Sequence, residues 1–239
     1  MKSFGSIFCV LSLVMPLYGA ERVLYDGTTA QSPTSAGWTL MTDPLFGAQV
    51  TETPGAVGVT LDSTVAISDK GGYFSNAISS PAIVLDRDVG FTLRWRALVS
   101  AETHLTNDRA GFNVLVVCSD LMALELAHWE NEVWAQDGPP NTFTHAEGAT
   151  INTTSLREYE LIVQGDTYAL NVDGGEVLTG NLRDYSSFDP GLPINPYTTP
   201  NMIFLGDDTG SASASVRIDY ISLDAPTPLL YVTLPGIVS

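Results

Sequence analysis

The sequence contains few cations and few potential zinc ligands. Only 10 lysines and arginines stand against 27 aspartates and glutamates, which gives a formal net charge of −17. A surface this acidic repels phosphate backbones and anionic membranes, so we expect no nucleic-acid partner. Three scattered histidines and two cysteines offer no paired ligand spacing, which argues against a zinc site.

Long hydrophobic runs are also scarce, and the first one has the layout of a secretory signal peptide. Lys2 precedes an apolar run over residues 7–17, and the small residues Gly19 and Ala20 follow it. That run is shorter than the roughly 20 residues that a bilayer requires. We therefore expect residues 1–20 to be removed, the protein to be secreted or periplasmic, and the mature chain to lack a transmembrane segment.

Removal of this segment takes Cys9 with it and leaves Cys118 as the only thiol, so no intramolecular disulfide can form. Cys118 lies in the apolar stretch VLVVCSD, and we interpret it as a core residue without chemistry. The C-terminal residues 225–239 are apolar but interrupted by three prolines, which is unsuited to a membrane helix. We expect a short tail there, after a single domain over residues 21–224.

Helical periodicity is missing as well, whereas alternation with period two is frequent. Apolar side chains alternate with polar ones from Phe91 to Val99, which is typical of a half-buried strand. Two further alternating runs flank Gly165-Asp166, and Asp173-Gly174-Gly175 supplies a second turn, which together predict a three-stranded meander. Further strands are expected at Val23–Tyr25, Gly58–Leu61, Ile83–Leu85, Phe112–Cys118, Ala123–His128, Glu132–Ala135, Met202–Leu205 and Val216–Leu223. The pattern predicts an all-β, two-sheet antiparallel sandwich.

The order of several segments resembles the concanavalin-like, laminin-G-like jelly rolls. These segments are GFTLRWRALV, AGFNVLVV, ALELAHWENEVWAQ, YELIVQGDTYALNVDGGEVLTGNL and NMIFLGDDTGSASASVRIDYISL. The resemblance implies that the last strand pairs beside the first. Residues 72–223 are also similar to bacterial secreted "choice-of-anchor" domain proteins, through DRAGF at 108–112, Trp129, WAQ at 134–136, Thr144-His145, LRDY at 182–185 and GDDT at 206–209.

The jelly-roll resemblance, with strand parity, predicts a carbohydrate-binding site on the concave face of one sheet. Arg94 and Arg96 face outward if Trp95 faces the core, and Glu125 faces outward if Leu124 and Leu126 face the core. An exposed indole at Trp134 would give sugar rings an apolar platform. The predicted ligand-binding residues are Arg94, Arg96, Arg109, Glu125, Trp134, Gln136 and His145. The alternative is a surface ion-pair network.

Two enzymatic alternatives would use the same groove. A glycoside hydrolase needs two carboxyls on one face of a cleft, but Glu125 and Glu130 have odd spacing on a strand. A polysaccharide lyase could neutralise a uronate with Arg109 or Gln136 and use His145 as base, with Tyr185 as acid. Glu125 and His145 are therefore the catalytic candidates. A secreted structural protein that binds no sugar is the third hypothesis.

Calcium is the one cofactor that the sequence suggests. Acidic clusters at residues 86–88 and 206–209 offer hard oxygen ligands on expected loops, with Asp207 and Asp208 as the candidate ligands. Neither cluster matches an EF-hand loop, and acidic residues are also favoured in turns for backbone reasons.

Overall fold

The computed structural model describes residues 21–43, 47–75, 83–191 and 195–225. The expected signal peptide at 1–20 and all but the first residue of the expected tail at 225–239 lie outside the described residues. Within the described part, the chain forms β-strands and short 3₁₀ turns and no α-helix, which confirms the predicted all-β class. None of the described helical segments is long and apolar enough to cross a membrane.

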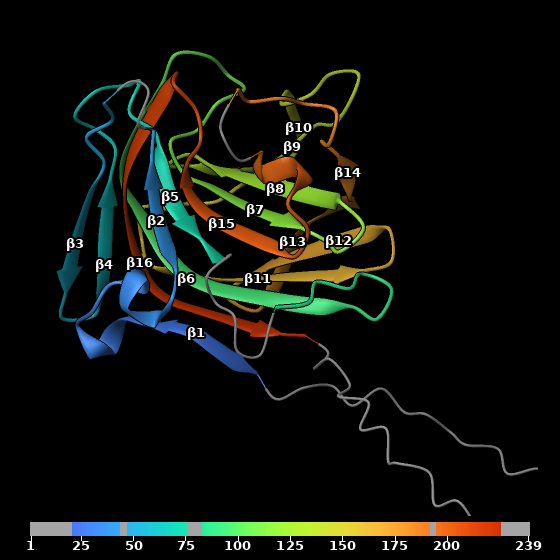
Figure 1. Ribbon diagram of the computed structural model, residues 1–239, viewed down its shortest axis with the longest axis horizontal. Coiled ribbons are helices and arrows are strands. Elements are labelled where there is room, and N and C mark those ends of the chain that lie inside the picture. Colours follow the sequence, from blue (N-terminus) through green and yellow to red (C-terminus); the bar gives the residue numbers. More distant parts are fainter. Residues whose placement is uncertain (1–20, 44–46, 76–82, 192–194, 226–239) are drawn as a thin grey trace, which may run out of the picture.

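Two antiparallel sheets make up the fold, and Figure 1 shows them as separate layers. Sheet A has the strand order β13 (Gly175–Asn181), β12 (Thr167–Val172), β11 (Arg157–Gln164), β6 (Phe91–His104), β16 (Ala212–Asp224), β4 (Gly58–Asp62) and β3 (Thr51–Gly55), with β1 (Arg22–Asp26) also paired to β16. Sheet B has the order β10 (His145–Thr150), β9 (Glu132–Gln136), β8 (Met122–His128), β7 (Asn113–Val117), β15 (Met202–Asp207), β5 (Gly71–Phe74) and β2 (Thr39–Thr42), with β14 (Arg183–Asp184) paired to β8. The pairing of β16 with β1 confirms that the last strand lies beside the first.

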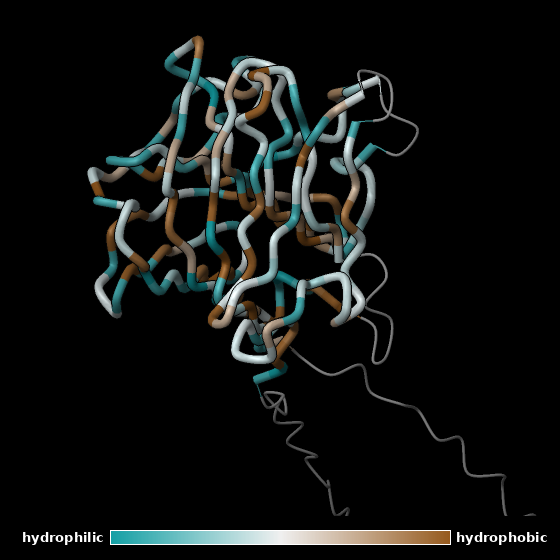
Figure 2. The backbone as a smooth tube through the Cα atoms, turned by 90° about the vertical axis from the view of Figure 1, so that its left-hand side faces the viewer, coloured by the Kyte–Doolittle hydropathy of each residue, from teal (hydrophilic) through white to brown (hydrophobic). Residues whose placement is uncertain are grey.

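The main core lies between the sheets because strands of both sheets bury alternate side chains there. β6 alternates buried and half-buried residues from Phe91 to Val99, as its sequence pattern predicts. From sheet B this core receives Val114, Val116, Leu124, Leu126, Val133, Ala135, Ile203 and Leu205. Cys118 is part of it, and burial raises the pKa of its thiol to about 12, as expected for an inert core residue. Figure 2 shows hydrophobic residues recurring along the strands inside the molecule.

The meander of β11, β12 and β13 forms as the turn residues predict. Gln164 pairs with Thr167, so Gly165-Asp166 is a two-residue turn. Val172 pairs with Gly175, and Asp173 and Gly174 between them have φ angles of 51° and 81°. Positive φ at both central positions is what a tight hairpin turn requires.

One expected strand is wrong, and several strands were not predicted. Residues 83–85 form no strand, although Ile83 and Leu85 are buried in the main core. The backbone N–H of Leu85 donates to the Asn201 side chain instead of to a neighbouring strand. The strands β2, β3, β5, β10 and β14 were not predicted, because their sequences are short or rich in glycine, threonine and proline.

Candidate functional site

The predicted site residues do not share one sheet. Arg94 and Arg96 lie on β6 of sheet A, whereas Glu125 lies on β8 of sheet B. Alternation along a strand reveals which residues share a face of that strand, but it does not assign the strand to a sheet. The prediction that these three residues share one sheet face is therefore wrong.

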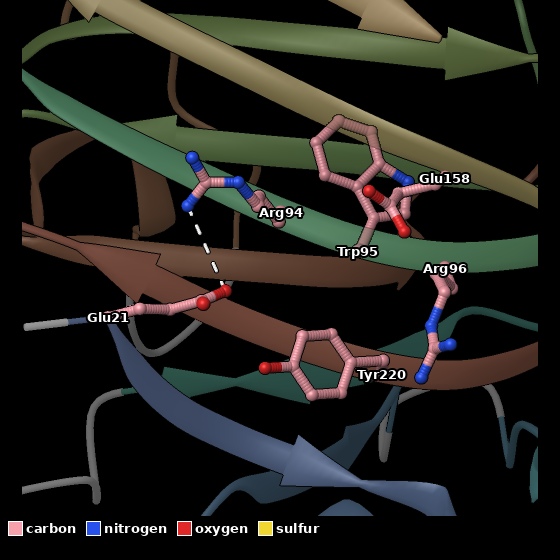
Figure 3. A pocket seen from close by; sticks show the side chains of 6 residues that line it. All are labelled: Glu21, Arg94, Trp95, Arg96, Glu158 and Tyr220. Carbon is pink, nitrogen blue, oxygen red and sulfur yellow. Dashed lines mark ion pairs between the residues drawn. The ribbon is translucent and has the colours of Figure 1, made fainter. Parts of the chain in front are cut away.

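Arg94 and Arg96 border a cavity of about 370 Å³ on sheet A, drawn in Figure 3. Arg94 donates to Glu160 across the sheet at 2.7 Å, and its Nη1 atom lies 3.8 Å from Glu21. The Arg96 guanidinium lies 4.9 Å from the ring centroid of Tyr220. Arg94 is held in ion pairs and the Arg96 guanidinium packs over Tyr220, so the ion-pair alternative describes the Arg94 side of this cavity better than a ligand groove does.

A larger cavity, of about 530 Å³, lies on the outer face of sheet B, the face turned away from the main core. Three of the predicted residues line it, namely Arg109, Glu125 and Gln136. So do the two candidate metal ligands, Asp207 and Asp208. We take this cavity as the candidate site.

One register row across sheet B forms part of the floor of this cavity. Glu125 of β8 pairs with Leu115 of β7, Leu115 pairs with Phe204 of β15, and Phe204 pairs with Phe74 of β5. All four residues line the cavity. The floor therefore changes from polar to apolar along the row.

Two loops bring aromatic side chains over this floor. Phe143, from the loop between β9 and β10, lies 5.2 Å from Tyr197 and 4.8 Å from Phe188, measured between ring centroids. Tyr197 belongs to the 3₁₀ turn η4 (Pro196–Thr198), whose first turn is capped by the side chain of Asn195. The rings of Phe143 and Tyr197 join Leu115, Met202 and Phe204 in a second hydrophobic cluster on the outer face of sheet B.

Glu125 is a deeply buried carboxyl of the cavity wall, with 2% of its surface exposed. Its Oε2 atom accepts a hydrogen bond of 2.8 Å from the Tyr197 hydroxyl. Burial, and secondarily the negative charge of Asp208, raise the pKa of Glu125 well above its usual range. A raised pKa favours the protonated form, which can serve as a hydrogen-bond or proton donor.

Asp207, which is buried, and Asp208, which is half-buried, also line the cavity and are held by protein donors. Asp208 accepts a hydrogen bond from Asn113 Nδ2 at 2.7 Å, and burial raises its pKa to about 6. Asp207 accepts from the Ser63 hydroxyl at 2.6 Å, and burial raises its pKa as well. No three His, Cys, Asp or Glu side chains cluster as metal ligands anywhere in the described ranges. The calcium site stays a prediction.

Three side-chain oxygens around the cavity have no hydrogen-bond partner in the described part of the protein. They are Asn113 Oδ1, Gln136 Oε1 and Asp208 Oδ2, and each belongs to a residue that lines the cavity. The orientation of each side-chain amide is fixed by a hydrogen bond from its nitrogen. Asn113 Nδ2 donates to the Ala110 carbonyl, and Gln136 Nε2 donates to the Asp108 carbonyl. These three oxygens have almost no exposed surface, so they are acceptors within the cavity wall.

Arg109 supplies a cation at the polar end of the cavity. Its Nη1 atom donates to the carbonyl oxygens of Asp108 and Phe143, at 2.7 and 2.5 Å. Its charge also lowers the pKa of both Glu125 and Asp208, partly offsetting the effect of burial. The guanidinium therefore joins the loop before β7 to the loop before β10 at the polar end of the cavity.

Trp134 and His145 lie outside this cavity. Trp134 is completely buried beneath Trp129 and the His145 ring, whose centroids lie 4.4 Å from its own. Trp134 therefore provides no exposed platform, and that expectation is wrong. His145 hydrogen-bonds Glu132 and the Asn107 carbonyl and does not line the cavity. The predicted lyase acid, Tyr185, is also buried, and its hydroxyl donates to the Gln136 carbonyl.

Sequence reasoning missed most of the apolar wall, including Phe74, Leu115, Tyr197 and Phe204. A signal was present in β7 and β15, where every residue is buried. Their continuous apolar runs, NVLVV and MIFL, indicate strands covered on both faces rather than half-buried strands. Such runs predict that something packs against the outer face of the sheet.

Comparisons with known proteins add evidence on the fold. No protein-family model matches the sequence, and no curated protein matches it. A carbohydrate esterase from the Shiga toxin-encoding bacteriophage phi24B is similar in structure, with a TM-score of 0.52 and 15% identity over 86% of this chain and 96% of that chain. A transglycosylase, Crh5, has a TM-score of 0.51 and 14% identity over 88% of this chain and 87% of that chain. A sialidase has a TM-score of 0.53 and 12% identity over 85% of this chain, which spans only 18% of the sialidase. The fold is a jelly-roll β-sandwich.

Proposed function

We propose that this is a secreted protein that binds a glycan in the cavity on the outer face of sheet B. The observation that carries the proposal is the set of three unpartnered acceptors, Asn113 Oδ1, Gln136 Oε1 and Asp208 Oδ2, around one cavity. Buried polar atoms are usually hydrogen-bonded, so a convergent group without partners suggests a ligand that donates. A sugar presents several hydroxyl donors at a spacing that can satisfy such a group.

Three further features support this proposal. The cavity volume, about 530 Å³, falls in the range of roughly 300–1,000 Å³ that is common for small-molecule sites. Aromatic rings such as Tyr197 can face the apolar C–H surface of a sugar. The similar structures named above include an esterase of carbohydrates, a transglycosylase and a sialidase, and export is suggested by the signal-like residues 1–20.

The test is a glycan array followed by isothermal titration calorimetry with Gln136→Met. Gln136 Oε1 would accept from the ligand, so its loss should weaken binding by about three- to tenfold, the value of one hydrogen bond. Gln164→Met is the matched control, because Gln164 also donates one hydrogen bond to a backbone carbonyl but lies on β11 of sheet A. Absence of binding across the array, or equal affinities for the two variants, would contradict the proposal and favour a structural protein.

A second candidate function is glycan cleavage, and the state of Glu125 favours it. Burial keeps the pKa of Glu125 high, so its carboxyl can protonate a departing glycosidic oxygen, while Asp208 supplies a second carboxyl in the same cavity. The lyase alternative has less support, because His145 and Tyr185 lie outside the cavity.

Incubation with polysaccharides should then release reducing ends, and Glu125→Gln should abolish the release while retaining glycan binding. The glutamine oxygen keeps an acceptor for the Tyr197 hydroxyl but cannot donate the proton. Products that absorb in the near ultraviolet would indicate a lyase instead. Binding without any product would leave the protein as a binding module.

A further inference from the structure

The cavity on sheet B is divided into a polar and an apolar half. The unpartnered acceptors, Arg109 and Glu125 lie toward β7, β8 and β9. Along the register row the floor continues through Leu115 and Phe204 to Phe74 of β5. A sugar ring alone needs one apolar surface and many hydrogen bonds, so the second half of the floor exceeds what a sugar requires.

The apolar half is shaped by close packing of Phe204 against a glycine. A Cβ atom on Gly72 would lie 2.3 Å from Phe204 Cε2, so only glycine lets the ring lie over β5. The ring then stands 4.8 Å from that of Phe74, and both rings line the cavity. The arrangement provides a continuous aromatic surface across β15 and β5.

Part of this apolar surface is uncovered. Phe74 is only partly buried, and Phe188, which lines the same cavity from the loop before η4, is 38% exposed. The charged side chains that line the cavity near β5 have protein partners: Lys70 pairs with Asp43 at 3.0 Å, and Asp207 accepts from the Ser63 hydroxyl at 2.6 Å. Uncovered aromatic surface without unmatched charge attracts hydrocarbon rather than a second polar group.

We propose that the ligand is a glycan that carries an apolar substituent, such as an alkyl, acyl or aryl group. The sugar lies at the end with Glu125 and Gln136, and the substituent lies over Phe204 and Phe74. This inference rests on the proposed function and specifies the ligand class of the same cavity.

The experiment compares methyl and hexyl glycosides of glucose, galactose, mannose and N-acetylglucosamine by isothermal titration calorimetry with the full mature chain. Hexyl tri(ethylene glycol) is included as a hydrocarbon without a sugar. Each buried methylene strengthens binding about fourfold, so the hexyl form of a bound sugar should bind at least tenfold more tightly than the methyl form. It should also bind at least tenfold more tightly than the sugar-free compound.

The possible results separate the two proposals. Equal affinities for methyl and hexyl glycosides would overturn the apolar-substituent inference and leave glycan binding standing. Equal affinities for the hexyl glycoside and hexyl tri(ethylene glycol) would overturn the proposed function. No binding of any compound would overturn both.

Single-residue variants test where in the cavity the apolar substituent binds. Phe74→Ala should reduce the hexyl-over-methyl affinity ratio at least threefold, because it removes one wall of the aromatic surface. Leu156→Ala, which truncates an exposed leucine outside the cavity, should leave the ratio unchanged. Circular dichroism checks folding, and Phe188→Ala provides a second, loop-based variant if Phe74→Ala does not fold. A ratio unaffected by both phenylalanine variants would overturn the placement.

Discussion

Asp208 and His128 are buried titratable residues that respond to pH in opposite directions, because burial disfavours the charged form of each. Burial raises the pKa of Asp208 from 3.8 to about 6. It lowers the pKa of His128 from 6.5 to about 3, in a site enclosed by Phe112, Tyr159 and Trp95. Compared with the unfolded chain, the folded protein therefore favours the protonated form of Asp208 and the neutral form of His128.

Asp208→Asn should stabilise the protein increasingly as the pH rises from about 4 to about 6. Within this window the folded state binds more protons at Asp208 than the unfolded state, so the wild type loses stability as the pH rises, and the variant does not. The difference in unfolding free energy should grow by roughly 1–3 kcal/mol, and urea unfolding at pH 4, 5, 6 and 7 measures it. The exposed Glu176→Gln is the control. A constant difference across these pH values would argue against burial of a charge at Asp208.

His128→Leu should make the protein less sensitive to acid. Between about pH 6.5 and pH 3, His128 is protonated in the unfolded wild type but neutral in the folded wild type. The stability of the folded state is therefore not reduced by His128 above pH 6.5, and it falls as the pH drops below that value. Relative to the wild type, the variant should gain a few kcal/mol between pH 7 and pH 4. Thermal unfolding over this range provides the readout, with the half-exposed His104→Leu as control. If both variants respond alike, the neutral buried state of His128 is not the cause.

At the scale of strands, the sequence predicts which side chains share a face but not which strands share a sheet. Alternation correctly predicted the buried face of β6 and the turns of the meander. Arg94 and Glu125 nevertheless face opposite sides of the sandwich, because long-range pairing places β6 in sheet A and β8 in sheet B. Only three of the seven predicted ligand-binding residues, Arg109, Glu125 and Gln136, line the candidate cavity.

Local turn chemistry is more predictable, and the β12–β13 turn offers a matched test. Gly174 has a left-handed φ angle of 81°, whereas Gly175 does not have a positive φ. A Cβ atom added to either glycine would meet no heavy atom closer than 3.4 Å. Gly174→Ala should therefore destabilise the protein by about 1 kcal/mol through backbone strain alone. Gly175→Ala should cost less, and chemical denaturation of the two variants compares them. An equal effect at both positions would show that steric contacts, rather than φ, limit this turn.

Across the whole molecule, sheet B is covered on both faces and sheet A mainly on one. The main core lies between the sheets, and the second cluster, with Leu115 and Phe204, lies on the outer face of sheet B beneath Phe143 and Tyr197. Period-two alternation cannot indicate this second layer, since covered strands show continuous apolar runs instead. The loops that form the layer lack any periodic signal, which explains why the apolar half of the cavity escaped prediction.

The net charge of −17 is a property of the whole molecule. Added ions can act on it in two ways, by screening the charge or by binding at a specific site. Repulsion among surface carboxylates destabilises the compact state, and salt screens it over a Debye length of about 10 Å at 0.1 M. Raising NaCl from 10 to 200 mM should therefore increase the unfolding temperature by a few degrees. A bound calcium would add a separate stabilisation that saturates at low concentration, because a ligand that binds only the folded state shifts the equilibrium by mass action.

Calcium chloride at 1 mM, compared with sodium chloride at equal ionic strength, distinguishes these effects. A rise in unfolding temperature that appears only with calcium and disappears in Asp207→Asn would support the predicted ligand. Asp207→Asn keeps one acceptor oxygen, which can serve the Thr209 backbone N–H. Its Nδ2 would donate to the Ser63 hydroxyl, whose own proton can turn to the Ala214 carbonyl. Identical responses to the two salts would leave the acidic surface as the whole explanation of the ion dependence, and Asp207 and Asp208 as part of the polar wall of the cavity on sheet B.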